Sequence, residues 1–346
     1  MTNHPDGALL KSVSRSFYLT IKALPAKIRG PIGLGYLLAR ATDTVADSAN
    51  TPVKVRMQNL DALRTLITSG SSRVALDRIK KAIVPEDAAE REMIGRLDAV
   101  LDWLESMPVY DRADIVEVLR KITRGQELDL MRFGSETGVV ALQTAEELDE
   151  YTYLVAGCVG EFWTNVCARH LPSFAKLEVE KMRELGVNFG KGLQLVNILR
   201  DLPADLKAGR CYLPLASVGL DPDAINSNPR LGRAVFESWL TVAVKHLDDA
   251  HQYIRALSNW RLRYACILPW HLGMRTLLLL RENPPFETLA GSGEGAANRG
   301  HPAKIKVSRG EVRLLLAKAA FWACSNFALR LERDRLARSF YTGCNK

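Results

Sequence analysis

Two separate runs of the sequence carry acidic side chains at spacings that suit a divalent metal ion. In GYLLARATDTVADS, Asp43 and Asp47 are four residues apart, so on a helix their side chains would share one face, about 6 Å apart. Tyr36 and Arg40 continue the same stripe, and the opposite face is apolar. Two carboxylates this close repel each other, and a shared cation would reverse that repulsion. The alternative is an ordinary solvated helix face.

A second acidic run lies far along the chain, in FGKGLQLVNILRDLPADLKAGRCYLP. Its polar stripe consists of Gln194, Asn197, Asp201 and Asp205, and the other positions of the expected helix are mostly apolar. A carboxylate on a buried helix needs a cation or strong hydrogen-bond donors to stay ionised. Pro203 removes one helical N–H group, so we expect Asp205 to lie past a kink.

The donor types of these two runs indicate Mg²⁺ or Mn²⁺ and a diphosphate. The candidate ligands are oxygen donors without a neighbouring His or Cys, which disfavours zinc. Mg²⁺ typically bridges a few carboxylates to substrate phosphates. Nearby cations would neutralise the remaining phosphate oxygens, namely Arg40, Arg200, Lys207 and Arg210. Loss of diphosphate would leave a carbocation, which aromatic faces in an apolar pocket can stabilise; the candidates are Phe17, Tyr36 and Tyr151.

A third run, EYTYLVAGCVGEFW, combines aromatic and small residues. Ala156, Gly157 and Gly160 would let two helices approach closely, and Tyr151 lies one helical turn before Val155. A tyrosine here is either a core aromatic with a satisfied hydroxyl or, beside a diphosphate, a group that transfers a proton.

The elements that must position these runs are predicted to be helices. Strand-like alternation is scarce, and apolar residues recur at intervals of three and four in segment after segment. The best examples are Met93–Leu104, Ile115–Ile122, Leu185–Leu202, Ala234–Leu257 and Val312–Leu331. We predict an all-α fold of at least eight helices, forming a single large bundle that encloses a central apolar cavity, as one domain over residues 1–346. Tyr264–Leu280 contains Pro269, His271 and Arg275, which predicts a buried, interrupted helix and not a membrane span.

Composition narrows the class of protein. With 346 residues, 47% hydrophobic and 25% charged, the chain is neither disordered nor fibrous. A formal charge of +8 attracts anions, although no nucleic-acid-binding motif is present, so we expect no nucleic-acid partner. Scattered cysteines and an N-terminus without an apolar signal predict a cytoplasmic protein. The basic segment LERDRLARSF leaves open a peripheral contact with the inner membrane face.

A Gly- and Pro-rich segment at residues 282–303 predicts a flexible surface loop, or alternatively an ordinary linker. Basic residues follow it directly, in AKIKVSRG, and would be placed to hold an anionic ligand.

The order of SRSF, DTVAD, YTYLVAGCVG, LQLVNILRDLPAD and GRCYLP resembles the squalene/phytoene synthases over nearly the whole chain. This resemblance implies an isoprenoid synthase fold and head-to-head joining of two prenyl diphosphates. It also implies that both acidic runs bind Mg²⁺–diphosphate, through Asp43, Asp47, Asn197, Asp201 and Asp205. Positions that the resemblance assigns to the substrate are Arg15, Ser16, Phe17, Tyr36, Val155, Gln194 and Arg210. Tyr151 is implied to handle a proton, with Arg40 and Arg200 as further catalytic residues.

Two segments, HPAKIKVSRGEV and YACILPWHLGMRTL, resemble squalene synthases in particular. They imply condensation of two farnesyl diphosphates to presqualene diphosphate and reduction by NADPH to squalene, with cofactor contacts at Lys304, Lys306 and Arg309. Ala46 stands where eukaryotic members often have an acid, which suggests a bacterial enzyme. The resemblance to squalene synthases also implies a place in sterol or hopanoid biosynthesis, and we expect a monomer or weak homo-oligomer.

Three alternatives stay open from the sequence. Phytoene or dehydrosqualene synthases would use the same metal site without a reductant, and a terpene cyclase would use a single prenyl chain. A protein of another class, a non-catalytic helical module that binds a stabilising divalent ion, would also explain the acidic runs.

Overall fold

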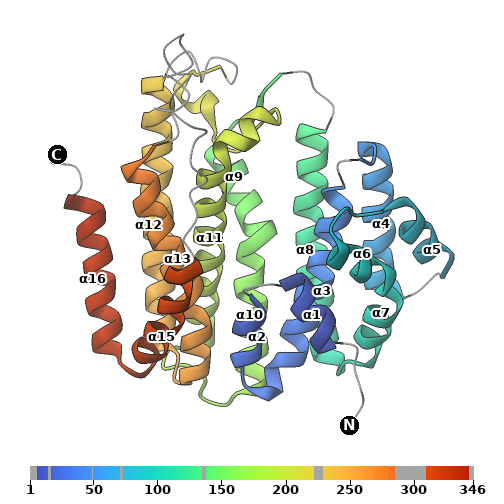
Figure 1. Cartoon of the computed structure of the whole chain (residues 1–346), viewed down its shortest axis with the longest axis horizontal. Coiled ribbons are helices and arrows are strands. Elements are labelled where there is room, and N and C mark those ends of the chain that lie inside the picture. The colour runs from blue at the N-terminus through green and yellow to red at the C-terminus, as the bar shows by residue number, and fades with distance from the viewer. Residues whose placement is uncertain are drawn as a thin grey trace. The chain divides into compact units, whose positions relative to one another are not determined.

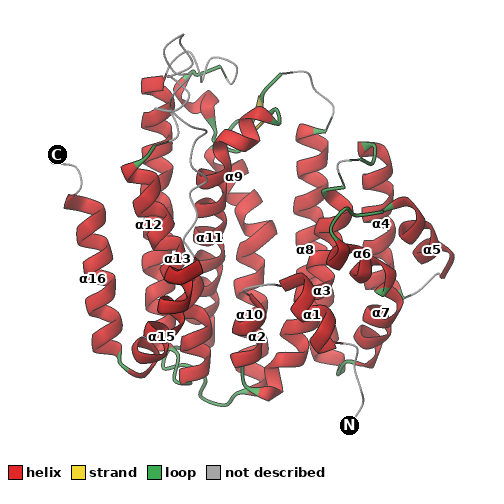
Figure 2. Ribbon diagram, viewed as in Figure 1, coloured by secondary structure: helices red, strands yellow, loops and turns green. Residues whose placement is uncertain are grey.

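A computed structural model of the chain describes residues 6–14, 17–48, 50–70, 73–134, 138–221, 229–284 and 309–342. Helices dominate these ranges, and the strands found there are two short ones, β1 (Val140–Ala141) and β2 (Arg210–Cys211) (Figures 1 and 2). The prediction of an all-α fold is confirmed. The helices group into two compact units, one of residues 1–135 and 161–174, the other of residues 136–160 and 175–346. A single domain over residues 1–346 stays a prediction.

The first unit is built around α3 (Ala26–Ala46), which packs against α1, α2, α4, α6, α7 and α8. The apolar stripe expected on α3 is buried: Leu34, Leu37, Leu38 and Val45 are at most 1% exposed. Burying such side chains contributes about 1.5–3 kcal/mol each, so α3 is anchored firmly by the face opposite its acidic residues. The helices around it are α1 (Asp6–Ser14), α2 (Phe17–Ala23), α4 (Val53–Ser69), α5 (Arg73–Ala82), α6 (Ala88–Gly95), α7 (Leu97–Ser106) and α8 (Val109–Phe133).

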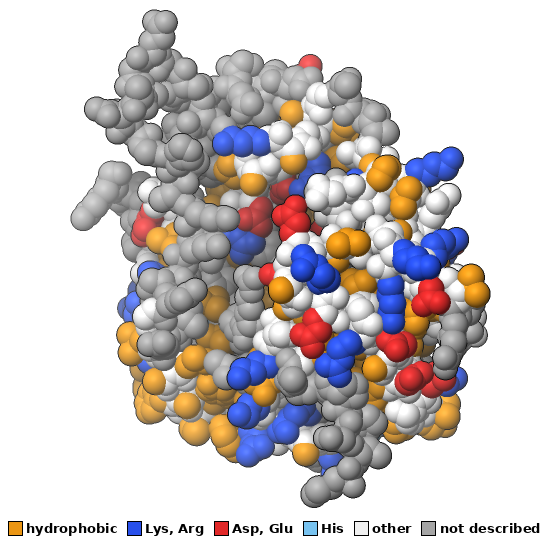
Figure 3. Space-filling model, turned by 45° about the vertical axis from the view of Figure 1, so that its right-hand side comes forward, with side chains coloured by type: hydrophobic (Ala, Val, Ile, Leu, Met, Phe, Trp, Pro, Cys, Tyr) orange, Lys and Arg blue, Asp and Glu red, His pale blue; other side chains and the backbone are white. Residues whose placement is uncertain are grey.

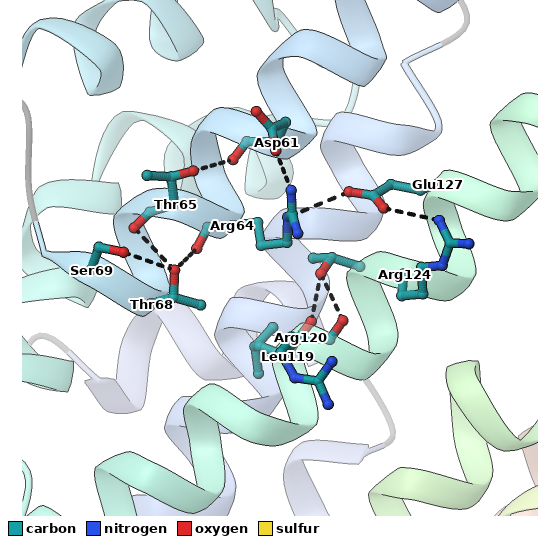
Figure 4. A network of polar contacts seen from close by, with 10 residues as sticks. Asp61, Arg64, Thr65, Thr68, Ser69, Leu119, Arg120, Arg124 and Glu127 are labelled. Atoms are coloured by element: carbon teal, nitrogen blue, oxygen red, sulfur yellow. Dashed lines mark hydrogen bonds and ion pairs between the residues drawn. The ribbon is translucent and has the colours of Figure 1, made fainter.

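A polar network joins α4 to α8 (Figure 4). Arg64 of α4 pairs with Asp61 on its own helix and with Glu127 of α8, whose carboxylate lies 3.4 Å from the Arg64 Nε. Arg124 approaches the second oxygen of Glu127 at 3.7 Å. Glu127 is largely buried, so losing its cations would leave a poorly solvated charge. The network therefore helps to fix the rotation of α8 in the turn that contains Gln126.

The second unit is centred on α11 (Val179–Lys207), which lies along α12 (Pro229–Ala256) and also contacts α13 (Trp260–Glu282) (Figure 1). Before α11 come α9 (Ala145–Thr152), one turn of π-helix, η1 (Tyr153–Gly157), and α10 (Cys158–His170), whose residues from 161 onward belong to the first unit. A 3₁₀ turn, η2 (Leu215–Val218), follows β2. The chain ends with α15 (Arg309–Cys324) and α16 (Asn326–Thr342), which pack on α13.

Several expected helix boundaries were wrong. The expected helix Met93–Leu104 is broken at Arg96, which separates α6 from α7, and Val312–Leu331 is broken at Ser325. Ser325 accepts a hydrogen bond from the Ala328 N–H through its hydroxyl, so it caps α16. The interruption expected in Tyr264–Leu280 is also absent, because α13 continues through Pro269 and is buried along most of its length. Tertiary packing there outweighs one lost hydrogen bond.

Within the described ranges, no helix has the length and apolar content needed to cross a bilayer. The predicted loop at 282–303 lies outside the described residues from position 285 onward. On the face shown in Figure 3, Lys and Arg side chains are interspersed with acidic and apolar ones. The net positive charge is therefore not confined to one broad field on that face.

Candidate functional site

The first acidic run lies at the C-terminal end of α3. Asp43 is half-buried, and its carboxylate accepts a hydrogen bond of 2.6 Å from the Gln126 side-chain amide of α8, which also donates to the Thr42 hydroxyl at 3.1 Å. Burial and the neighbouring charge of Asp47 raise the pKa of Asp43 to about 6. Asp47 ends the helix and is exposed. The pair thus combines a hydrogen-bonded carboxylate whose pKa is raised with a solvent-exposed carboxylate. A cation bound to both would stabilise their negative charges.

Arg40 and Tyr36 continue this stripe toward the start of α3, as predicted. The Arg40 guanidinium forms an ion pair with Glu90 of α6. The Tyr36 hydroxyl donates to the Val13 carbonyl at 3.4 Å, and burial raises the pKa of Tyr36. The stripe is therefore held by contacts from α1 and α6 as well as α8.

A pocket of about 250 Å³ opens beside the exposed end of the stripe. It is lined chiefly by polar and charged side chains, namely Arg40, Thr44, Asp47, Ser48, Asn50, Glu86, Asp87 and Glu90, with Val84 and Pro85. Its acidic character suits a cation better than a bare anion.

The second acidic run lies near the C-terminal end of α11. Arg200 donates two hydrogen bonds to its neighbour Asp201, at 2.9 and 2.5 Å. The Asn197 side-chain amide donates to the Gln194 side-chain oxygen at 3.3 Å. This forked arginine–carboxylate contact orients both groups on one side of the helix.

Asp205 belongs to the same helix, because α11 continues through Pro203 to Lys207. The helix is therefore not broken at Pro203, and the expected kink before Asp205 stays a prediction. Pro203 occurs in the last turns, where it removes only one hydrogen bond. Burial raises the pKa of Asp205, and a hydrogen bond of 2.9 Å from Arg210 acts in the opposite direction.

Arg210 is positioned by a tight backbone turn after α11. It forms part of β2, which pairs in parallel with β1 in the register Val140 to Arg210. The preceding residue, Gly209, has a φ of +77°, and a Cβ there would lie 2.9 Å from the Gly138 carbonyl oxygen. The first two residues of GRCYLP therefore have separate roles. Gly209 allows the tight turn, and that turn brings the Arg210 side chain back to Asp205, to which it donates a hydrogen bond.

Tyr151 is buried at the end of α9, where its ring stacks on that of Tyr212 with centroids 4.9 Å apart and an interplanar angle of 22°. Val155 lies in the π-helical turn η1 and is half-buried. The stacking fixes the plane of the Tyr151 ring. A fixed ring is compatible both with a core aromatic residue and with a tyrosine that transfers a proton.

Helices in this region approach as closely as the small residues predicted. A Cβ on Gly160 would lie 1.9 Å from the Gly186 carbonyl oxygen of α11, and one on Gly190 would lie 2.2 Å from the Ala156 carbonyl oxygen. Backbone packs directly on backbone at both positions. The predicted close packing is confirmed, and it joins the turn after Tyr151 to the helix that carries the second acidic run.

Each unit brings together its own set of candidates. In the first unit Tyr36, Arg40, Asp43 and Asp47 share the polar stripe of α3. The second unit holds Tyr151, Val155, Gln194, Asn197, Arg200, Asp201, Asp205 and Arg210 on α9, η1, α11 and β2. Arg15, Ser16, Lys304 and Lys306 lie outside the described residues, while Phe17 begins α2 and Arg309 begins α15.

Sequence reasoning missed Gln126, Glu90 and Tyr212, which contact Asp43, Arg40 and Tyr151 respectively. Gln126 and Glu90 come from helices distant in sequence and carry no local motif. Tyr212 lies within GRCYLP, so that motif was the available signal.

The model of the squalene/phytoene synthase family matches residues 10–298. The chain belongs to the squalene/phytoene synthase family. Among its relatives, the squalene synthase of Cyberlindnera jadinii is 27% identical over 288 residues, 81% of this chain and 62% of the relative. The Botryococcus squalene synthase of Botryococcus braunii is 26% identical, over 80% of this chain and 57% of the relative. A bifunctional lycopene cyclase/phytoene synthase of Colletotrichum graminicola is 31% identical, over 72% of this chain and 41% of the relative.

These matches span about 57 to 62% of the length of the two squalene synthases. Solved structures share the fold: TcSQS with the ligand E5700 superposes with a TM-score of 0.69 at 19% identity, covering 96% of this chain and 94% of that one. A dehydrosqualene synthase with a bound ligand gives a TM-score of 0.55 at 18% identity, covering 91% and 94%. The expected isoprenoid synthase fold is confirmed.

Squalene/phytoene synthases are prenyltransferases that bind prenyl diphosphates with a divalent metal, and the oxygen donors of both acidic runs fit such an ion. Within the described residues no three His, Cys, Asp or Glu side chains gather into a metal cage. Mg²⁺ does not need one, since it keeps several waters and takes one or two carboxylates together with substrate phosphates. The carboxylate oxygens of Asp43, whose pKa is raised to about 6, and of its neighbour Asp47 would suit such an ion.

Proposed function

We propose that this member of the squalene/phytoene synthase family is a squalene synthase, which condenses two farnesyl diphosphates to presqualene diphosphate and reduces that product with NADPH. The observation that carries the proposal is the extent of the match. Alignments to four squalene synthases cover 80 to 81% of the chain, whereas alignments to four bifunctional lycopene cyclase/phytoene synthases cover 64 to 72%.

The geometry of the two acidic runs supports diphosphate chemistry. Asp43, Asp47, Asn197, Asp201 and Asp205 would hold Mg²⁺ or Mn²⁺, which supplies positive charge to the departing diphosphate. Arg40, Arg200 and Arg210 already donate to Glu90, Asp201 and Asp205. Their guanidinium groups are therefore oriented by carboxylates and are prepared to donate to phosphate oxygens, which have similar acceptor geometry.

The remaining candidates have roles in shielding and proton handling. Tyr151, held in plane by Tyr212, would take or deliver the proton during coupling, and the apolar surroundings exclude water. We assign the substrate-binding role to Arg15, Ser16, Phe17, Tyr36, Val155 and Gln194. Lys304, Lys306 and Arg309 would contact the phosphates of NADPH in the reductive step.

The deciding experiment incubates the purified chain with farnesyl diphosphate and Mg²⁺, with and without NADPH, and identifies the products by chromatography and mass spectrometry. We expect presqualene diphosphate without NADPH and squalene with it. A C30 product unchanged by NADPH would assign dehydrosqualene synthase instead. A parallel reaction with geranylgeranyl diphosphate tests for phytoene synthase, which the 31% identical relative favours. Absence of any prenyl product would leave the non-catalytic metal-binding module.

A further inference from the structure

One corner of the second unit exposes three large aromatic side chains. Trp260 at the start of α13, Phe321 near the end of α15 and Phe327 at the start of α16 are 53%, 66% and 62% exposed. Exposed rings of this size are costly in water when they gather on one surface. We name this surface, defined by the three residues, the aromatic corner.

A single arginine ties these helix ends together. The Arg263 Nη2 donates to the Asn326 side-chain oxygen at 2.6 Å and to the Trp322 carbonyl at 3.5 Å. Arg263 lies one helical turn after the exposed tryptophan, Trp322 follows Phe321, and Asn326 precedes Phe327. The three aromatic residues therefore belong to one place in the fold, where α13, α15 and α16 pack together (Figure 1).

Apolar residues extend the corner along both terminal helices. Leu314 is 55% exposed and lies two helical turns before Phe321, while Leu331 is 49% exposed and lies one turn after Phe327. Each pair shares one helix stripe. The opposite stripes face inward, through Leu315, Ala319 and Trp322 on α15 and through Leu329 and Leu336 on α16. Both helices thus bury an apolar stripe on their inward side and also expose large apolar side chains on their outward side.

The two sequence segments that carry the corner, residues 250–281 and 312–331, contain basic residues and no acidic ones. No Asp or Glu occurs between Glu311 and Glu332, or between Asp249 and Glu282. Glu332 itself is turned inward, where it pairs with His271 and Arg335.

Cations stand beside the exposed rings. The Arg261 guanidinium lies 5.5 Å from the Trp260 ring centroid, the Arg330 guanidinium lies 5.9 Å from that of Phe327, and Lys318 is exposed on α15. Within the described part of the chain, no ion pair joins Arg261, Lys318 or Arg330 to an acidic side chain. Aromatic rings flanked by uncompensated cations combine the two contacts that a bilayer interface offers, apolar acyl chains and anionic headgroups.

We propose that the aromatic corner docks on the surface of a membrane that contains anionic lipids. The aromatic and leucine side chains enter the interface, and Arg261, Lys318 and Arg330 contact lipid phosphates. A second copy of this chain is a poorer occupant, because an isologous contact would bring the same cations together. Docking is peripheral, and it neither requires nor uses the proposed catalytic reaction.

The test is sedimentation of the full chain with vesicles of phosphatidylcholine, alone or mixed with phosphatidylglycerol. We expect binding to the mixed vesicles that weakens as salt is raised. The double variant Phe321→Ser/Phe327→Ser should lower the partition coefficient about tenfold or more. The double variant Lys318→Glu/Arg330→Glu should lower it at least about fivefold for each cation lost.

A matched control comes from the first unit. Tyr110 on α8 is 73% exposed and has the Arg169 guanidinium 5.8 Å from its ring centroid, but Arg169 also pairs with Asp111 and Asp114, so Tyr110→Ser removes an exposed ring that has no uncompensated cation beside it. This variant should bind vesicles as the unaltered chain does, and thermal unfolding should show that all variants fold. Absent binding to mixed vesicles, or an equal loss in Tyr110→Ser, would overturn the proposal. A lipid-free dimer that the corner variants convert to monomer would assign the surface to self-association instead.

Discussion

At the scale of single residues, Asp43 is the most constrained group of the candidate site. One oxygen accepts the short hydrogen bond from Gln126, and the charge of Asp47 lies one turn away. The hydrogen bond favours the ionised form, yet burial and Asp47 outweigh it, so the pKa rises to about 6. The fold therefore maintains a carboxylate that costs stability at neutral pH, which is typical of a group kept for function.

Asp43→Asn should stabilise the fold while it abolishes turnover. The folded-state pKa of about 6 exceeds the ordinary value of 3.8, so the stability of the unaltered protein falls as pH rises between these values. Asn removes that penalty and still accepts from Gln126. We expect a gain of about 3 kcal/mol in the free energy of unfolding at pH 7.5 and only about 0.5 kcal/mol at pH 4. Urea denaturation of both proteins at the two pH values measures it, and prenyl turnover should fall by about a thousandfold. An equal difference at both pH values would contradict the assigned pKa.

Gln126→Met should impair catalysis without unfolding the protein. Methionine has a similar volume but no donor, so Asp43 loses its anchor and its pKa rises further. A loss of about 10- to 100-fold in kcat/KM is expected for a lost partner of a metal ligand, with the acidic limb of the pH profile moved to higher pH. Gln252→Met is the matched control, since it removes an exposed amide-to-carboxylate bond of 3.1 Å to Asp249 on α12. A purely structural role for Gln126 would leave the pH profile where it was.

At the scale of elements, α11 combines the close backbone packing with the second acidic run. Gly186 and Gly190 face Gly160 and Ala156, and the acidic residues follow some three turns later on the same helix. Any sideways movement of the π-helical turn relative to α11 would therefore alter the relation of Tyr151 to Gln194 and Asn197. Close packing of backbone is stiff, because no side chain lies between the helices to adjust.

Gly160→Ala should destabilise the protein strongly. The new Cβ would fall 1.9 Å from the Gly186 carbonyl oxygen, so one of the two backbones must move. We expect a loss of about 2–3 kcal/mol in the free energy of unfolding, measured by urea denaturation, together with reduced turnover. Gly95→Ala provides the comparison, since nothing lies within 4 Å of the added Cβ at the end of α6. That variant should be neutral or more stable by about 0.5–1 kcal/mol. Equal effects of the two substitutions would count against the close contact.

Helix content was predictable from the sequence, whereas helix ends were not. The three- and four-residue recurrence of apolar side chains that identified α8, α11 and α12 reports a buried face, which tertiary structure preserves. Breaks at Arg96 and Ser325 depend on backbone capping, and continuity through Pro203 and Pro269 depends on surrounding packing. For the same reason only part of the candidate site was predictable. The sequence revealed the polar stripe of α3, but Gln126 and Glu90 contact that stripe from other helices.

At the scale of the whole molecule, the cation that the family uses is not expected to hold the fold together. Each acidic run is already satisfied by contacts of its own, with Gln126 on Asp43, Arg200 on Asp201 and Arg210 on Asp205. No described cluster of three ligands would bind a metal ahead of substrate. We therefore expect metal and diphosphate to bind together, and their contacts with the acidic residues to replace the hydrogen bonds from Gln126, Arg200 and Arg210.

Removal of divalent metal should separate activity from stability. Treatment with EDTA should abolish prenyl transfer, and added Mg²⁺ or Mn²⁺ should restore it. The thermal midpoint, measured by circular dichroism without substrate, should be the same before and after chelation. A midpoint that drops by several degrees would instead indicate a structural ion, as expected of a stabilised binding module.

The π-helical turn Tyr153–Gly157 has a consequence for the register of everything that follows it. One residue advances an α-helix by about 100°, and a π turn accommodates one extra residue without displacing the rest of the rod. Deleting a single residue there would convert the turn into regular α-helix and would leave Tyr151 in nearly its present direction relative to Gly160. An ungapped alignment to a relative whose helix is regular here would therefore pair Tyr151 with a residue that lies about 100° away around the helix.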